Sequence, residues 1–215
     1  MYLAQIKVGS MGNFSYLIAD SVERRGIVID PGWPGIEADK ILGRAEDDEI
    51  SIRYIVATHF HSDHIGGVRY LMERSRAELV LHEGELYSMN CLGFEPDIII
   101  KNDGIYNLGG LSVRIIHTPG HSPGSICLYT NRRLFTGDTL FVGGCGRADL
   151  PRSDPEKLYS SIYDKIMILP DETEVYPGHD YGTSPFSTIG REKMENPYLK
   201  CPSLEAFLRL RMGKI

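Results

Sequence analysis

The sequence has few cysteines, and none of them are spaced as a structural metal site would require. Four occur in 215 residues, and no two of them form a Cys-x-x-Cys pair. A chain of this length with so few cysteines is not built on a disulfide scaffold, so we expect free thiols in a reducing compartment. The four are Cys91, Cys127, Cys145 and Cys201.

Long apolar runs and long basic runs are also absent. No stretch reaches membrane-spanning length, and the first residues do not combine a basic region with an apolar one, as a signal peptide would. The formal net charge is −6, from 23 basic and 29 acidic side chains, without the basic footprint typical of nucleic-acid binding. We therefore expect a cytoplasmic protein that has neither a membrane nor a nucleic acid as its partner.

The remaining composition is that of an ordinary globular protein. Hydrophobic residues make up 42% of the chain and charged residues 24%. A core of useful size can form without disulfides or a structural metal, so a bound metal is free to do chemistry. Linkers, repeats and low-complexity segments are missing. We predict a single domain over residues 1–215, with a short helical extension from about residue 186.

Hydrophobic patterning predicts two strand-rich halves with helices on their flanks. Residues 52–57 form a compact apolar run, which is typical of a strand buried on both faces. Asp154 before Pro155 predicts the start of a helix over 155–168. The other expected strands are 2–8, 14–19, 26–29, 79–82, 104–108, 111–117, 125–129, 134–136 and 174–176, with helices at 36–45, 67–74 and 203–212 and an irregular stretch up to about residue 96. Two sheets packed face to face with helices outside follow from this order, an α/β fold of the α+β type.

The strongest chemical signal is the segment Thr58-His59-Phe60-His61-Ser62-Asp63-His64. Three histidines and one aspartate fall within six positions, directly after the strand predicted to be buried. A loop at the end of a strand aims closely spaced side chains into one space. Imidazole and carboxylate groups are the usual ligands of zinc and neighbouring transition metals, whereas the plainer alternative is a polar loop of solvated histidines.

Three further candidate ligands stand in similar settings, each shortly after a predicted strand and each preceded by glycine. They are His121 in Thr-Pro-Gly-His-Ser, Asp138 in Thr-Gly-Asp-Thr and His179 in Tyr-Pro-Gly-His-Asp. Glycine lets the backbone turn tightly and come close to an ion. Each one alone would more often be an ordinary turn residue, and their repetition favours a metal site.

Taken together, these motifs resemble the metallo-β-lactamase superfamily, in the family's order and over nearly the whole chain. The resemblance is especially close to the glyoxalase II-like branch, through Gly-Asp-Thr-Leu-Phe at 137–141 and Gly-Cys-Gly-Arg at 144–147. It implies an αββα sandwich. It also implies two divalent metal ions, zinc first and iron or manganese as alternatives. One metal would be held by His59, His61 and His121 and the other by Asp63, His64 and His179, with Asp138 bridging them.

The chemistry implied by this resemblance is hydrolysis by a hydroxide shared between two metals. Two divalent ions can lower the pKa of a shared water from near 16 to about 7, and the same ions polarise a carbonyl. No protein nucleophile is needed. Asp63 and Asp138 are the expected catalytic carboxylates, and Asp63 can orient the hydroxide. Asp30 in Ile-Asp-Pro-Gly has two interpretations of equal weight, a turn residue or a residue that fixes a ligand histidine.

Two residues differ from those expected in other branches of the family, and these differences restrict the class of substrate that we expect. Asp138 stands where zinc β-lactamases would have cysteine, and His61 where flavodiiron-type members would have glutamate. A small thioester of the hydroxyacylglutathione type, or another thiol-derived substrate, is then expected. Arg147 and Tyr181 are candidate substrate-binding residues; a surface arginine and a packed tyrosine are the plainer alternatives. Full-length glyoxalase II enzymes carry a longer helical region after the position of His179.

Two alternatives to a hydrolase stay open. A persulfide dioxygenase would use one iron, which by resemblance would sit on His59, His121 and Asp138. Pro177-Gly178-His179 and the segment 148–151 match the hydrolases better, because many dioxygenases are expected to have Pro-Ala-His. The third hypothesis is a non-catalytic metal-binding protein on the same fold, whose expected mark would be lost ligands. Cys145 is either an oxidation-sensitive thiol near the pocket or a buried structural cysteine. The oligomeric state is left open.

Overall fold

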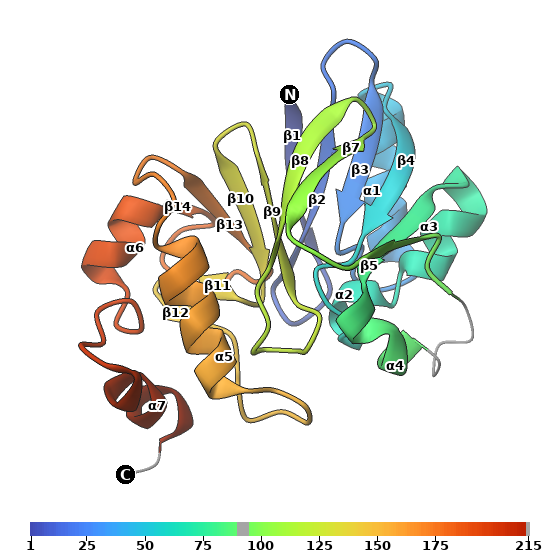
Figure 1. Ribbon diagram of the computed structural model, residues 1–215. Helices are drawn as coiled ribbons and strands as arrows, with labels where there is room; N and C mark the ends of the chain where they lie inside the picture. The colour runs from blue at the N-terminus through green and yellow to red at the C-terminus, as the bar shows by residue number, and fades with distance from the viewer. Residues whose placement is uncertain (90–94, 214–215) are drawn as a thin grey trace.

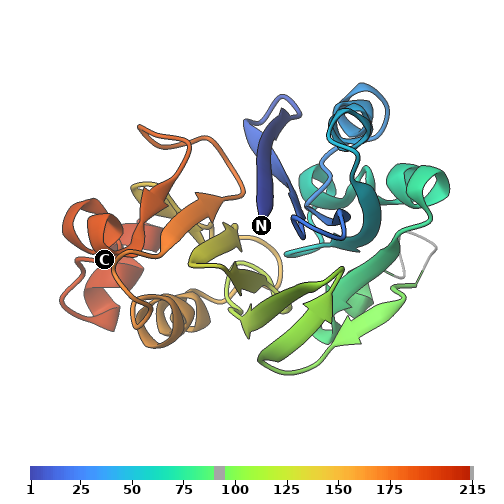
Figure 2. The same ribbon diagram turned by 90° about the horizontal axis from the view of Figure 1, so that it is seen from above.

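Two six-stranded sheets face each other in the computed structural model, which describes residues 1–89 and 95–213 (Figures 1 and 2). The first sheet has the order β1-β2-β3-β4-β5-β6, antiparallel from β1 to β3 and parallel from β3 to β6. Its strands are β1 (Tyr2–Val8), β2 (Asn13–Ala19), β3 (Arg25–Ile29), β4 (Ser51–Val56), β5 (Glu78–His82) and β6 (Ile98–Ile100).

The second sheet has the order β14-β13-β10-β9-β8-β7, in which only the β10–β13 pair is parallel. Its strands are β7 (Gly104–Leu108), β8 (Leu111–His117), β9 (Ile126–Thr130), β10 (Arg133–Gly137), β13 (Glu174–Pro177) and β14 (Ser187–Thr188). A small hairpin of β11 (Leu140–Phe141) and β12 (Gly144–Cys145) follows β10. Both sheets are therefore mixed.

Helices cover the two outer faces of this pair of sheets (Figure 1). On the first sheet lie α1 (Ile36–Asp47) and α3 (Val68–Ser75), with the short α2 (Ser62–Ile65), the 3₁₀ turn η1 (Glu83–Glu85) and α4 (Leu86–Met89) nearby. On the second lie α5 (Pro155–Ser160), the π-helical η2 (Ser161–Ile166), α6 (Ile189–Glu195) and α7 (Leu204–Met212). The Asp154 side chain accepts hydrogen bonds from the backbone of Glu156 and Lys157, so the predicted helix start is confirmed.

Three clusters of buried hydrophobic residues fill the spaces between the four layers of helices, sheet, sheet and helices. One lies between the first sheet and its helices, one between the two sheets, and one between the second sheet and its helices. Ile55 belongs to the first cluster and Val56 to the second, so the prediction that this strand is buried on both faces is confirmed. Burying such a side chain contributes about 1.5–3 kcal/mol relative to leaving it exposed. The αββα sandwich expected from the sequence is the observed fold.

Several local predictions were wrong. The segment after β4 was expected to be a loop, but residues 62–65 form α2, a single turn in which the backbone carbonyl of His61 accepts from His64 and Ile65. The stretch after β5 was expected to be irregular, yet 83–89 is helical. The helix over 155–168 changes to π geometry from Ser161. Strand β6 was not predicted, because three residues are too few to show a clear hydrophobic period. Helix α6 lies within the helical extension expected from about residue 186.

Cys91, one of the four cysteines expected to be free thiols, lies outside the described residues. The division of the chain into one domain with a helical extension from about residue 186 stays a prediction. Among residues 1–89 and 95–213, no helix has the length and apolarity that a membrane crossing needs.

Candidate metal centre

All seven candidate ligands come together at one edge of the sandwich, although they belong to both sheets. His59 and His61 follow β4, and Asp63 and His64 lie on α2. His121 follows β8, Asp138 follows β10 and His179 follows β13. Carboxyl ends of strands from the two sheets thus deliver the ligands to a shared space.

The first donor group consists of His59, His61 and His121, whose candidate ligand atoms all lie within 4.8 Å of one another. His121 Nε2 is 2.8 Å from His61 Nδ1. His121 Nδ1 donates to the carbonyl oxygen of Arg147 at 2.9 Å, which leaves a lone pair on Nε2. Nε2 of His59 is buried and has no hydrogen-bond partner among the described residues.

The second donor group consists of Asp63, His64 and His179, again within 4.8 Å of one another. Nδ1 of His64 donates to Asp30 Oδ2 at 2.9 Å, and Nδ1 of His179 donates to the carbonyl oxygen of Met11 at 3.1 Å. Their Nε2 atoms lie 3.1 Å apart, and both face Asp138 Oδ1. When both rings are neutral, each Nε2 carries a lone pair, and a cation between the two relieves their repulsion.

Asp138 stands between the two donor groups. Its Oδ2 lies 3.5 Å from His121 Nε2, whereas its Oδ1 lies 3.3 Å from His64 Nε2 and 3.4 Å from His179 Nε2. One carboxylate thus presents one oxygen to each group, which is the placement expected of a bridging ligand. Oδ1 is buried without a hydrogen-bond partner among the described residues.

Electrostatics keep the imidazoles of the first donor group neutral and favour a positive charge at the second. Burial lowers the pKa of His59 well below its usual value and the pKa of His61 to about 4, and it also lowers the pKa of His121. Burial alone would lower the pKa of His64 too, but the carboxylates of Asp138 and Asp30 raise it well above its usual value. A positive charge is therefore stabilised at the second donor group.

The same neighbours keep the bridging carboxylate ionised. Burial alone would raise the pKa of Asp138, but the imidazoles of His64 and His179 hold it well below its usual value. Metal ions require deprotonated carboxylates and neutral imidazoles. His59 Nε2 and Asp138 Oδ1 are buried without a hydrogen-bond partner among the described residues. These two atoms, together with the other imidazole and carboxylate donors, fit a pair of divalent cations.

All three glycines that precede the candidate ligands are required by close approaches. A Cβ on Gly120 would lie 2.3 Å from the Cα of Leu158. A Cβ on Gly137 would lie 2.3 Å from Thr58 Oγ1, and the φ of this residue is +47°. A Cβ on Gly178 would lie 2.6 Å from Asp138 Oδ1 and 2.9 Å from His64 Cε1. Any side chain at position 178 would therefore displace the bridging carboxylate.

Asp30 is placed to fix a ligand histidine. Its Oδ1 accepts a hydrogen bond from the backbone N–H of Thr58 at 2.7 Å, and its Oδ2 accepts from Thr58 Oγ1 at 2.6 Å as well as from His64. Asp30 is 2% exposed and has a φ of +51°, so the turn interpretation and the ligand-fixing interpretation both apply.

Sequence reasoning missed Asn13. Its Nδ2 donates to Asp63 Oδ2 at 2.8 Å and to the Asp63 carbonyl oxygen at 3.2 Å. Asn13 is the first residue of β2, 50 positions from Asp63, and no local pattern connects the two. The backbone carbonyls of Met11 and Arg147 were missed for the same reason.

A pocket of about 300 Å³ opens onto both donor groups. Its apolar lining comes from Met11, Phe141, Leu150 and Tyr181. The Tyr181 ring stacks on that of His179, with centroids 4.5 Å apart and planes at 13°. Tyr181 is nevertheless 57% exposed, so its free face is available to a bound molecule.

Arg147 lines the same pocket but is already paired. Its guanidinium donates to both carboxylate oxygens of Asp149, from Nε at 2.9 Å and from Nη2 at 2.8 Å. Both side chains are largely exposed, so the pair is of the weak, surface kind. The sequence offered two interpretations for this arginine, and the pairing with Asp149 was not among them.

Cys145 is a buried cysteine of the third core cluster. Burial raises the pKa of its thiol to about 12, so the reactive thiolate is scarce near neutral pH. Burial likewise raises the pKa of Cys127 to about 11. The structural interpretation of Cys145 is the one that these surroundings support.

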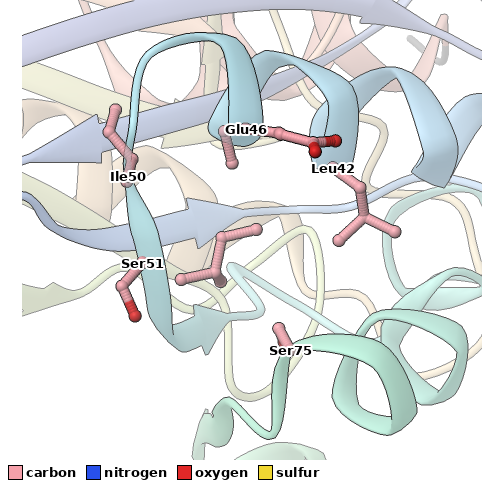
Figure 3. A pocket seen from close by; sticks show the side chains of 7 residues that line it. Leu42, Glu46, Ile50, Ser51 and Ser75 are labelled. Carbon is pink, nitrogen blue, oxygen red and sulfur yellow. The ribbon is translucent and has the colours of Figure 1, made fainter.

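A second hollow, of about 320 Å³, lies between α1, β4 and α3, away from the histidines (Figure 3). Leu42, Glu46, Ile50, Ser51 and Ser75 surround it, together with Ala45 and Ile52. Glu46 is the only ionisable group in this lining, so the hollow lacks the chemistry of the metal centre.

Several known proteins are similar to this chain in sequence and fold. The family model described as metallo-beta-lactamase superfamily matches residues 8–179. A hydroxyacylglutathione hydrolase, GloC of Haemophilus influenzae, is 33% identical over 198 residues, covering 84% of this chain and 90% of the relative. The mitochondrial persulfide dioxygenase ETHE1 of Homo sapiens is 32% identical, covering 94% and 76%. BaeB of Bacillus velezensis, a probable polyketide biosynthesis zinc-dependent hydrolase, is 31% identical, covering 94% and 88%.

A solved structure shares the architecture almost throughout. ETHE1 from Myxococcus xanthus superposes with a TM-score of 0.89 at 31% identity, covering 99% of this chain and 91% of that one. The matched segment of the family model begins at the end of β1 and ends on the ligand His179, so it contains every candidate ligand. Taken with these relatives, the match shows that the chain belongs to the metallo-β-lactamase superfamily, in the glyoxalase II-like branch that contains hydroxyacylglutathione hydrolases and persulfide dioxygenases.

Proposed function

We propose that this chain hydrolyses small thioesters of the hydroxyacylglutathione type, using two divalent metal ions. Zinc is the proposed metal, with iron or manganese as alternatives. The proposal is supported by the relation to GloC and to the zinc-dependent BaeB. The crystal structure of TTHA1623 in a di-iron-bound form superposes with a TM-score of 0.76 at 30% identity, covering 91% of this chain and 100% of that one. This similarity supports the iron alternative.

The observation that carries the proposal is the close approach at Gly178. Because this residue has no Cβ, Asp138 Oδ1 can lie between His64 and His179 and face the second donor group. The Pro-Ala-His expected of many persulfide dioxygenases would place a methyl group 2.6 Å from that oxygen. Glycine at position 178 therefore favours a complete second metal position, and hence two-metal hydrolysis.

The residues have distinct proposed roles. His59, His61 and His121 would hold one ion, Asp63, His64 and His179 would hold the other, and Asp138 offers an oxygen to each group. Two divalent ions bound there would supply a water of lowered pKa and a Lewis acid for the carbonyl. Asp63, whose Oδ2 is fixed by Asn13, orients the attacking water. Tyr181 offers its exposed ring face to the substrate, and Arg147 at the pocket wall binds a carboxylate of the thiol part.

Persulfide dioxygenase activity is the second candidate. It is favoured by the similarity to ETHE1 from Myxococcus xanthus over nearly the whole length of both chains. One iron on His59, His121 and Asp138 would have the two-histidine, one-carboxylate pattern of non-haem oxygenases. A metal-binding protein without catalysis is the third.

Metal stoichiometry and two assays separate these candidates. Protein purified without added metal is submitted to elemental analysis, and thiol release from S-lactoylglutathione is compared with oxygen uptake on glutathione persulfide. We expect about two metals per chain and thiol release without oxygen uptake. A single iron with persulfide-dependent oxygen uptake would establish the dioxygenase instead. Two bound metals with neither activity would leave the non-catalytic binding protein.

A further inference from the structure

A buried carboxylate lies beside the metal centre and belongs to neither donor group. Glu85, the last residue of η1, is 0% exposed. Its Oε1 accepts hydrogen bonds from Ser122 Oγ and from the backbone N–H of Gly124, the latter at 2.6 Å. Its Oε2 is buried and has no partner among the described residues. Among the described residues Glu85 forms no ion pair, and the Arg152 guanidinium attracts it only from a distance. A buried carboxyl group in this situation destabilises a fold, so packing alone does not explain it.

The two groups that donate to Glu85 belong to the loop that carries His121. In this loop, between β8 and β9, the Ser122 backbone N–H donates to Ser125 Oγ at 3.1 Å. Ser122 Oγ also lies 2.6 Å from Ser125 Oγ. The Ser122 side chain and the Gly124 backbone therefore converge on Glu85 Oε1, and Ser125 contacts Ser122 beside them.

The backbones of the two segments touch. A Cβ on Gly84 would lie 2.8 Å from the Cα of Gly124, and a Cβ on Gly124 would lie 2.8 Å from the backbone nitrogen of Glu85. Beside this contact, the rings of His82 and His117 stack at 3.9 Å. The position of η1 therefore sets the position of the His121 loop.

The contact matters because the first donor group is divided between the two sheets. His59 and His61 follow β4, which pairs with β5, and η1 continues directly from β5. His121 comes from the second sheet. We propose that Glu85 is a positioning residue, which fixes His121 at the distance from His59 and His61 that a shared metal ion requires. This inference rests on the proposed metal centre but not on the proposed substrate.

Stepwise zinc affinity, measured by chelator competition, tests the inference without an activity assay. Glu85→Ala removes the acceptor, whereas Glu85→Gln keeps an oxygen that can accept from Ser122 and Gly124. Glu192→Ala is the matched control, because Glu192 is 1% exposed and accepts from the backbone N–H of Gly143 at 2.9 Å, far from the His121 loop in sequence. Thermal unfolding of the metal-free proteins reports the structural cost of each change.

We expect Glu85→Ala to weaken one of two zinc-binding steps by roughly 10- to 100-fold, the usual cost of losing a residue that orients a ligand. Glu85→Gln should restore near-normal affinity, and Glu192→Ala should lower stability while leaving both steps unchanged. If Glu85→Ala does not fold, Ser122→Ala takes its place and should weaken the same step.

Three results would overturn the inference: unchanged zinc binding in Glu85→Ala or its substitute, an equal loss in Glu192→Ala, or no rescue by Glu85→Gln. A wild-type protein that binds no zinc, iron or manganese would instead overturn the metal centre itself. A wild-type protein that binds two ions but hydrolyses no thioester would overturn only the proposed substrate.

Discussion

The two donor groups are held in different ways. In the first, His121 is fixed by a backbone carbonyl, and burial leaves the three imidazoles neutral. In the second, Asp30 and Asn13 fix His64 and Asp63, and carboxylates raise the pKa of His64 well above its usual value. The first group is therefore a neutral pocket for a cation, and the second carries negative charge of its own. Loss of a carboxylate should affect the second group more than the first.

We expect the largest effect from a substitution in the first donor group. His61→Ala removes a ligand whose side chain lines the pocket and is only partly buried, so the fold should survive. We expect metal affinity at one position and thioester hydrolysis to fall together, by more than the ~100-fold that loss of a ligand-orienting residue costs. Elemental analysis and thiol release measure the two quantities. Full hydrolysis in this variant would remove the two-metal mechanism.

Gly178→Ala acts on the bridge between the groups. The added methyl group would lie 2.6 Å from Asp138 Oδ1 and 2.9 Å from His64 Cε1, so the carboxylate must move away from the second group. We expect metal content to fall from about two ions toward one, with a matching loss of hydrolysis. Gly43→Ala is a suitable control, because a Cβ there has no atom within 4 Å. Two tightly bound ions in Gly178→Ala would mean that the glycine does not decide stoichiometry.

Asp30→Asn tests the difference between the groups directly. Asparagine tolerates the left-handed backbone at this position, so the turn should persist. Of the two carboxylates that raise the pKa of His64, Asp138 stays and Asp30 is lost. We expect the second binding step to weaken by roughly 10- to 100-fold while the first changes little. Stepwise zinc competition separates the two steps. Equal weakening of both would show that the groups do not act independently.

The smallest expected effect lies outside both groups. Asp149→Asn releases the Arg147 guanidinium from an exposed ion pair without touching a ligand. We expect KM for a carboxylate-bearing thioester to fall by roughly 2- to 5-fold, as suits a surface pair, with kcat and metal content unchanged. Steady-state kinetics with an anionic and a neutral thioester provide the comparison. An equal change with both substrates would argue against Arg147 as a carboxylate ligand.

The candidate ligands could be selected from the sequence because the selection depends on local features. His59, His61, Asp63 and His64 are neighbours in the chain, and His121, Asp138 and His179 each follow a strand that patterning predicts. The layer order also followed from patterning, since apolar runs mark buried strands wherever they occur. Short elements such as α2 and β6 were not predicted, because they contain only four and three residues.

The sequence by itself therefore determined which residue types could bind metal and at which strand ends they would lie. Only the tertiary structure decided how each ligand is held, because the partners are distant in the chain. Asn13 and Asp63 are 50 positions apart, Met11 and His179 are 168 apart, and Glu85 and Gly124 are 39 apart. Propensity and periodicity describe neighbours within a few residues. Strand order within the first sheet brings Asn13 to Asp63, and the packing of one sheet against the other brings Met11 to His179 and Glu85 to Gly124.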